Sequence, residues 1–200
     1  MIATLYDIHG NLPALEAVLA EIPDDATIVV GGDVCFAGEQ PAEVLERLRA
    51  LGERVVWVRG NTDRELEAEG KTGSKLSAEQ LSFLHRLPPT QQIGRVLYCH
   101  ATPRNDVDVF TVETPEERIA VLFEDVDADV VVCGHTHMQF DRTIAGKRVI
   151  NSGSVGHPFE DEPGAYWTLD LAHRFTPYEG APVPERSRAE TLAEYTRVGL

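Results

Sequence analysis

Seven residues whose side chains can bind metal ions stand at the ends of apolar, strand-like segments. They are two carboxylates, four imidazoles and one amide: Asp7, His9, Asp33, Asn61, His100, His135 and His137. Imidazole and oxygen donors of this kind suit divalent first-row metal ions. Two such ions about 4 Å apart can hold both the attacking and the leaving oxygen of a phosphoryl displacement, so the set predicts phosphoester hydrolysis.

An alternation of strands and helices in the first two-thirds of the chain must position these residues. Strands are predicted at 2–6, 26–30, 54–58, 95–99 and 129–133. Helices are predicted at 12–19, 41–52, 77–87 and 114–126, and 64–75 is predicted as a helix start and a loop. Asn11 is the expected cap of the first helix, and Ser77 with Gln80 forms a capping box for the third. Alternation implies parallel strands with right-handed crossovers, and ligands of such sheets gather at the carboxyl ends of the strands.

The last third of the chain has a β-rich pattern. The stretch QFDRTIAGKRVINSGSV predicts a hairpin with Ala145 and Gly146 at its turn, and 165–171 predicts another strand. This part is expected to give a second sheet packed on the first. Because there is no repeat or clear linker, we expect a single domain over 1–200, with 184–200 as a C-terminal helical tail.

Charge and composition exclude several classes of protein. The 200 residues include 33 acidic and 18 basic ones, a formal net charge of −15. This charge argues against general nucleic-acid binding and against binding to anionic membranes. No apolar run approaches the roughly 18 residues of a membrane helix, and the start MIATLYDIHG lacks the pattern of a signal peptide. The sequence predicts a cytoplasmic protein whose three cysteines, with no CxxC pair, stay reduced.

Five short motifs follow predicted strands in a fixed order: DIHGN, GGDV, GNTD, HA and GHTH. In this order the chain resembles the calcineurin-like metallophosphoesterases from residue 2 to about 157. The stretches DIHGNLPALEAVL and INSGSVG resemble the small bacterial and archaeal phosphodiesterase branch of that family. The resemblance implies the α/β fold of metallo-dependent phosphatases, a four-layer α/β/β/α sandwich of two mixed sheets flanked by helices.

The resemblance also implies two divalent metal ions, and Mn, Fe, Co, Ni and Zn all suit the donors. It assigns to the first ion Asp7, His9, Asp33 and His137, and to the second Asp33, Asn61, His100 and His135, with Asp33 bridging. A hydroxide between the ions would attack phosphorus, while Asn61 and the histidines stabilise charge on the phosphate oxygens. Asp33, Asn61 and His100 are the expected catalytic residues.

Two positions depart from the family pattern. Many members have a histidine where Thr62 stands. Because threonine cannot act as a general acid at neutral pH, diesters and activated esters are expected to be better substrates than monoesters. Tyr6 takes the place of a small residue; it is expected to fill the core, although it could narrow the pocket.

The expected substrate contacts come from Asn61, Thr62 and Arg104. Arg104 could bind a phosphate oxygen, or it could form a loop salt bridge instead. Asp63 is expected to orient its neighbours or cap a helix rather than bind metal. His157 is expected at the surface, with a substrate contact left open.

The predicted function is therefore a binuclear-metal-dependent phosphoesterase acting on a small phosphoester, with phosphodiesters favoured. Two alternatives stay open: a phosphomonoesterase, and a non-catalytic scaffold of the same fold. A scaffold should lack several ligands, and this chain has all seven. Self-association through the Pro-rich, charged tail also stays open.

Overall fold

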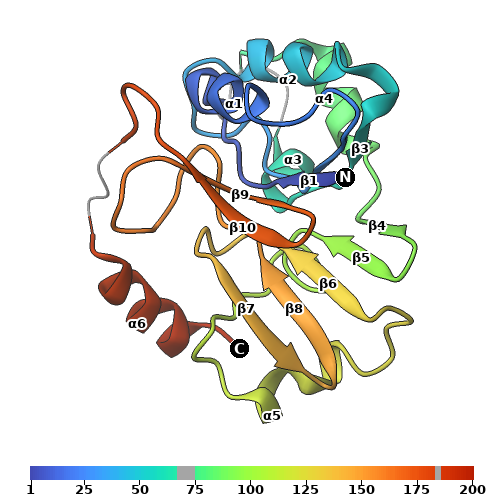
Figure 1. The fold of residues 1–200 in the computed structure, drawn as a ribbon, viewed down its shortest axis with the longest axis vertical. Coiled ribbons are helices and arrows are strands. Elements are labelled where there is room, and N and C mark those ends of the chain that lie inside the picture. The colour runs from blue at the N-terminus through green and yellow to red at the C-terminus, as the bar shows by residue number, and fades with distance from the viewer. Residues whose placement is uncertain (67–74, 183–185) are drawn as a thin grey trace.

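Two five-stranded sheets form the centre of the computed structural model, which describes residues 1–66, 75–182 and 186–200 (Figure 1). The first sheet has the order β10 (Ala172–Thr176), β9 (Ala165–Leu169), β1 (Ile2–Leu5), β2 (Thr27–Val30) and β3 (Val55–Trp57). The second has the order β4 (Thr90–Ile93), β5 (Val96–Cys99), β6 (Val130–Cys133), β8 (Lys147–Asn151) and β7 (Phe140–Ile144). As predicted, β1 to β3 run parallel, and β5 runs parallel to β6. Strand β8, from the β-rich part, also runs parallel to β6.

The β-rich last third is divided between the two sheets. The hairpin that turns at Ala145 and Gly146 is confirmed as β7 and β8, and both strands belong to the second sheet. Strand β9 instead extends the first sheet, antiparallel to β1, where Thr4 pairs with Thr168. The second sheet takes β5 and β6 from the alternating part of the chain. Apolar patterns thus predicted β7, β8 and β9, whereas the packing of whole layers decided their neighbours.

The helices are α1 (Leu12–Leu19), α2 (Pro41–Arg49), α3 (Asn61–Glu65), α4 (Ala78–His85), α5 (Glu116–Ile119) and α6 (Arg188–Val198), with 3-10 turns η1 (Gly52–Arg54) and η2 (Ala120–Leu122). Asn11 caps α1 by accepting from Ala14 N, as predicted. Ser77 and Gln80 form the predicted capping box of α4. These local signals hold because each satisfies backbone N–H groups that a helix start leaves free.

One predicted helix is wrong in length. The helix expected over 114–126 is only the 4 residues of α5 followed by η2. In a longer helix, Glu124 and Asp125 would lie at the C-terminus, where the helix dipole disfavours negative charge. Of the stretch 64–75, α3 ends at Glu65 and the part at 67–74 lies outside the described residues.

Strands β4 and β10 carry no strand signal in the sequence. Their segments, TQQI and AHRFT, are largely polar, and most of their residues are not buried. Both strands lie at the edge of a sheet. An edge strand needs one neighbour and tolerates polar side chains, so its place depends on the strand beside it rather than on an apolar pattern.

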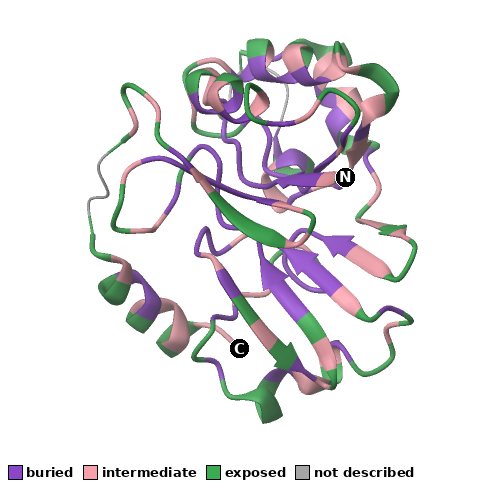
Figure 2. Ribbon diagram, viewed as in Figure 1, coloured by how far each residue is buried: buried purple, intermediate pink, exposed green. Residues whose placement is uncertain are grey.

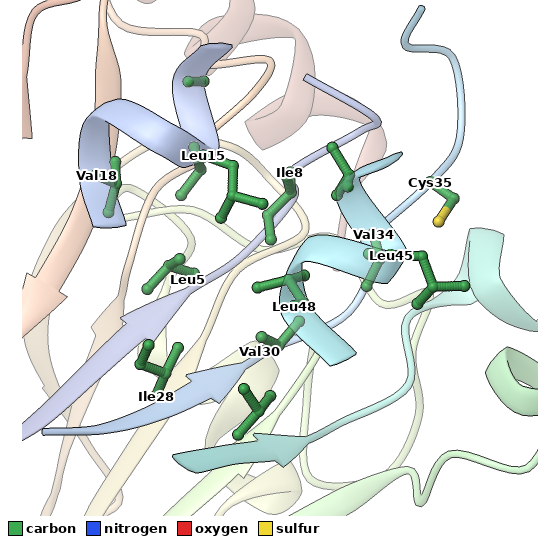
Figure 3. Packing of buried hydrophobic residues seen from close by; sticks show 14 of the residues in the cluster. Leu5, Ile8, Leu15, Val18, Ile28, Val30, Val34, Cys35, Leu45 and Leu48 are labelled. Carbon is green, nitrogen blue, oxygen red and sulfur yellow. The ribbon is translucent and has the colours of Figure 1, made fainter. Parts of the chain in front are cut away.

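Three separate apolar clusters show that the fold has four layers. The first lies between the first sheet and its helices (Figure 3); it includes Leu5, Ile28 and Val30 of the strands and Leu15, Val18, Leu45 and Leu48 of α1 and α2. The second lies between the two sheets and contains Tyr6, Val29, Val58, Tyr98 and Val132. The third packs Ile119 and Phe123 near α5 against Val131 and Val149 of the second sheet. The expected α/β/β/α sandwich is therefore confirmed, and Figure 2 shows buried residues on the strands of both sheets.

All three cysteines, Cys35, Cys99 and Cys133, are free and buried. Among the described residues, no helix combines the length and the apolar character needed to cross a membrane.

Candidate metal centre

The polar side chains that the sequence singles out meet where strands of both sheets end. A backbone hydrogen bond from Asp7 N to Gly32 O (3.1 Å) joins the loops after β1 and β2. Another, from Gly134 N to His100 O (2.8 Å), joins the segments after β6 and β5. The His100 ring connects the two sheets, because its Nδ1 donates to Gly31 O (2.9 Å). Carboxyl ends from both sheets therefore face one site.

Five of the seven predicted donors have a left-handed backbone conformation. Their φ angles are 53° at Asp7, 50° at His9, 53° at Asp33, 66° at His135 and 58° at His137. For a residue other than glycine this conformation costs on the order of 1–3 kcal/mol. Strain that recurs at five positions of one site indicates that the fold aims these side chains for a function.

Three of the four histidines are fixed by a hydrogen bond from Nδ1 to a backbone carbonyl oxygen. The acceptors are Phe36 for His9 (2.9 Å), Gly31 for His100 (2.9 Å) and His157 for His137 (2.5 Å). Because a carbonyl oxygen only accepts, Nδ1 carries the hydrogen, and in the uncharged ring Nε2 keeps a lone pair. The Nε2 atoms of His9 and His137 face each other at 3.2 Å. Two facing lone pairs repel unless a cation or a proton lies between them, so this arrangement favours a bound positive charge.

Asp7 lies among these rings and is fully buried. Its Oδ2 accepts from His135 N (2.9 Å), whereas its Oδ1 has no hydrogen-bond donor among the described residues. That Oδ1 lies 3.3 Å from His137 Nε2 and 3.9 Å from Nε2 of both His9 and His100. Burial alone would raise the pKa of Asp7, but the facing imidazoles, above all that of His137, outweigh burial when they are protonated and lower the pKa. An ionised, buried oxygen without a donor fits a metal ligand.

The remaining predicted donors form a second group next to Asp7. Asp33 Oδ1 lies 3.5 Å from His100 Nε2. One terminal atom of the Asn61 amide lies 3.1 Å from His100 Nε2 and 3.2 Å from His135 Nδ1. The ring centroids of His100 and His135 are 5.1 Å apart. The four residues expected around one ion are thus brought together.

Two sets of donor atoms have the spacing of ligands around a metal ion. One set is Asp7, His9 and His137, and the other is Asp7, Asp33 and His100, with all atoms of a set within 4.8 Å of one another. Carboxylate and imidazole donors suit divalent first-row ions, so the residues fit the implied metal. Asp7 is common to both sets, whereas the resemblance implied Asp33 as the shared ligand. Bridging by Asp33 stays a prediction.

Asp63 supports the second group from behind, in the orienting role expected of it. Its carboxylate accepts from the backbone N–H groups of Asp33 (2.8 Å), Val34 (3.0 Å) and Gly60 (2.9 Å). Burial, together with the charge of Asp33, raises the pKa of Asp63 to about 6. Thr62 donates its backbone N–H to Asp33 Oδ1 (2.9 Å), so this residue stands beside the second group.

Tyr6 fills the core, as the sequence favoured. Its side chain is fully buried between the sheets and its hydroxyl donates to Val132 O (3.0 Å). A Cβ added at Gly31 would lie 2.0 Å from the Tyr6 ring, and one added at Gly134 would lie 2.5 Å from it. The ring therefore depends on the absence of side chains at these two glycines.

Arg104 and His157 lie outside the two donor groups. Arg104 is exposed and donates to Val121 O (3.0 Å), an interaction outside the donor groups. The exposed His157 has its ring 5.9 Å from that of His9 and 5.7 Å from that of His137. A phosphate contact from Arg104 and a substrate contact from His157 stay predictions.

Sequence reasoning missed aromatic residues around the first donor group. Phe159 stacks on His137, with ring centroids 4.8 Å apart and planes at 22°, and Phe36 meets His9 edge-on at 6.4 Å. Phe36 follows Asp33 closely in the chain, which was a usable signal. Tyr195, which contacts Phe159, comes from α6, and nothing in its local sequence pointed to the site.

The metal-free protein is expected to lose stability as the pH falls from about 6.5 to about 4, in part through His9. Burial, and then the neighbouring His137, lower the pKa of His9 to about 4. Between these two values the unfolded chain binds a proton that the folded chain does not. The free energy of unfolding contributed by His9 therefore rises with pH, by at most about 1.4 kcal/mol per pH unit.

Urea unfolding in the presence of a chelator, from pH 4 to 7, checks this. The slope of stability against pH should be shallower in His9→Gln than in the wild type. Equal slopes in the two proteins would contradict the expectation.

An α/β/β/α sandwich that gathers carboxylates, imidazoles and an amide at its strand ends defines the class of metal-dependent phosphoesterases. Residues 1–174 match the family described as the Calcineurin-like phosphoesterase superfamily domain. This chain belongs to that superfamily. The family is metal-dependent, and the Asp and His groups described above could bind metal.

Similar proteins agree with this membership. The chain is 30% identical to phosphodiesterase YfcE of Escherichia coli (strain K12) over 178 residues, or 82% of this chain and 84% of YfcE. The structure of YfcE, a phosphoesterase from E. coli, matches with a TM-score of 0.53 and 27% identity, over 83% of this chain and 85% of that one. A metallophosphoesterase from Sphaerobacter thermophilus shares the fold, with a TM-score of 0.74 and 24% identity over 97% and 98% of the two chains. The predicted resemblance and the phosphoesterase function are confirmed, and a phosphodiesterase function fits these findings.

Proposed function

We propose that this protein is a phosphodiesterase that works with two divalent metal ions on a small phosphoester. Asp7, His9 and His137 would hold one ion, and Asp33, Asn61, His100 and His135 the other, with Asp7 or Asp33 shared. The environment of Asp7 Oδ1 supports this proposal most directly. This buried oxygen lacks a hydrogen-bond donor among the described residues and lies within 3.9 Å of three imidazole Nε2 atoms.

Divalent ions at this site would supply Lewis acidity and an activated water, and Mn, Fe, Co, Ni and Zn all suit the donors. The protein's own groups do the positioning. The Nδ1 hydrogen bonds fix the rings of His9, His100 and His137, as supporting contacts do in metal sites generally. Asp63 holds the backbone at Asp33 and Gly60. The Asn61 amide carries donor hydrogens next to the second group and can stabilise a phosphate oxygen.

Thr62 supports the choice of diesters over monoesters. It stands beside Asp33, where its backbone N–H is bonded, and its hydroxyl oxygen is buried without a partner among the described residues. A threonine hydroxyl does not release a proton at neutral pH, so it cannot protonate a poor leaving group. The relative YfcE bears the name phosphodiesterase, in agreement with this substrate class.

The test is to remove metal, add back Mn²⁺, and compare bis(p-nitrophenyl) phosphate with p-nitrophenyl phosphate. We expect metal-dependent cleavage, with kcat/KM at least about tenfold higher for the diester, a difference of about 1.4 kcal/mol in the barrier. Asp33→Ala and His135→Ala should abolish it, and His85→Ala should not. Thr62→His should raise monoester turnover relative to diester turnover.

The outcomes separate the parts of the proposal. Preference for the monoester in the wild type would refute the substrate class but keep the metal site. If the protein binds two ions but cleaves neither ester, neither test compound resembles its substrate. Failure to bind metal would favour a non-catalytic scaffold of the same fold.

A further inference from the structure

Helix α6 lies beyond the part of the chain that matches the superfamily, which ends at residue 174. Figure 1 shows that α6 returns to the side of the molecule where the connection between β8 and β9 runs. The helix is anchored at its end, where Leu200 N donates to Val109 O (2.8 Å), and along its length, where Leu192 is buried. Its docking is therefore a defined part of the fold.

An aromatic series leads from α6 to the first donor group. The Tyr195 ring meets Phe159 edge-on, with centroids 6.0 Å apart. Phe159 in turn stacks on the ring of His137 at 4.8 Å, with the planes at 22°. Both distances lie in the range in which aromatic pairs attract each other. The face of the His137 imidazole is thus covered by a ring that α6 supports from behind.

A polar cluster fixes the same segment. Arg188, the first residue of α6, forms an ion pair with Glu160 (2.7 Å) and donates from Nη2 to Gln139 O (3.2 Å). Glu160 accepts from Gln139 N (2.6 Å), and Asp161 accepts from Arg188 N (2.7 Å). Glu160 and Asp161, which follow Phe159, and Gln139, which follows His137, are therefore held by the start of α6.

The contacts of His137 show what this support achieves. Its Nδ1 donates to His157 O, and its backbone carbonyl accepts from Phe159 N (3.2 Å). Both partners belong to the segment that α6 holds. With Nδ1 tied to that segment and one face against Phe159, the ring has little freedom to turn its Nε2 away from Asp7.

We propose that α6 is a positioning element of the metal centre, acting through Tyr195 and Phe159 on the ring of His137. This inference rests on the proposed metal site. It assigns a role in metal binding to a helix outside the superfamily match. Because coupling between two sites is reciprocal, a bound metal should in turn stabilise the docking of α6.

The test measures metal binding rather than turnover. Metal-free full-length protein is titrated with Co²⁺ and followed by visible absorption and calorimetry. Phe159→Ala should weaken the binding of one of two ions by about tenfold or more and change its absorption band, as loss of a supporting contact does elsewhere. Phe159→Tyr should restore both, and Tyr195→Ala should give a smaller loss. Phe83→Ala, which removes a ring packed on Trp57 instead, is the matched control and should bind like the wild type.

Hydrogen exchange gives an independent readout that does not need a variant. Adding Co²⁺ to the wild type should slow exchange at the amides of α6 but not at those of α4. Unchanged affinity and spectrum in Phe159→Ala, with lower thermal stability alone, would overturn the inference and leave the metal site in place. No Co²⁺ binding by the wild type would overturn the proposed site and this inference together.

Discussion

Asp7→Asn is expected to lower metal-dependent phosphodiester turnover by about three orders of magnitude or more, equivalent to about 4 kcal/mol in the barrier. Asp7 belongs to both donor sets, so its loss weakens both ion sites. An asparagine could still accept from His135 N with its oxygen. Its NH₂ group would then replace Oδ1 and point hydrogens, without negative charge, at the imidazole lone pairs. The measurement is kcat/KM for the diester at saturating Mn²⁺, together with the number of ions bound per chain.

The same variant distinguishes loss of the metal site from loss of the fold. Metal-free Asp7→Asn should still unfold in one cooperative step, although at a lower urea concentration than the wild type, because the imidazoles that lower the pKa of Asp7 stabilise its charge in the folded protein. Burial by itself would lower the pKa of His137, but the charge of Asp7 outweighs burial and raises this pKa above its ordinary value. The pKa of His137 should therefore fall in the variant. Asp141→Asn, an exposed carboxylate paired with Arg148, is the control and should keep full turnover. Two tightly bound ions in Asp7→Asn would contradict the role given to Asp7.

Gly31→Ala is expected to destabilise the protein by about 3 kcal/mol or more, and Tyr6→Ser is expected to offset much of this loss. The three atoms nearest an added Cβ at Gly31, at 2.0–2.2 Å, all belong to the Tyr6 ring. Tyr6→Ser alone should also cost about 3–5 kcal/mol, because it leaves a cavity between the sheets. In the double variant the added methyl group has room. Its loss of stability should therefore be smaller than the sum of the two single losses, by at least about 2 kcal/mol. Urea unfolding of the four metal-free proteins measures this coupling.

Two comparisons make this experiment specific. Tyr6→Ser combined with Gly94→Ala should be additive, because an added Cβ at Gly94 meets nothing within 4 Å. Gly134→Ala should not be rescued to the same degree, since its Cβ would also lie 2.6 Å from Asp7 Oδ2. Additivity of Tyr6→Ser with Gly31→Ala would show that the site adjusts around the ring and would contradict the close packing seen here.

Much of the fold was predictable because its signals are local. The apolar strands β1, β2, β3, β5 and β6 and the caps at Asn11 and Ser77 follow directly from short sequence patterns. The polar edge strands β4 and β10 and the short helix α5 did not follow. Their conformation depends on a neighbouring strand or on charge at a helix end, which are properties of the assembled layers.

The candidate site shows the same division. The sequence predicted which seven side chains gather, because each stands at the end of a strand and such ends face one edge of a parallel sheet. It did not predict that Asp7 would be the carboxylate common to both donor sets, nor that five of the seven donors would adopt positive φ angles. These features arise where loops that follow strands of both sheets meet, and no short sequence pattern encodes them.

By itself, then, the sequence determined the donor types, their order and the superfamily, since each is carried by short motifs after apolar strands. The tertiary structure alone decided how the donors are held: which carbonyl fixes each of three imidazoles, why Tyr6 requires glycine at position 31, and that α6 lies against Phe159 beside His137. The physical reason is distance along the chain. Patterns of neighbouring residues set local conformation, whereas contacts between residues far apart form only when the four layers pack together.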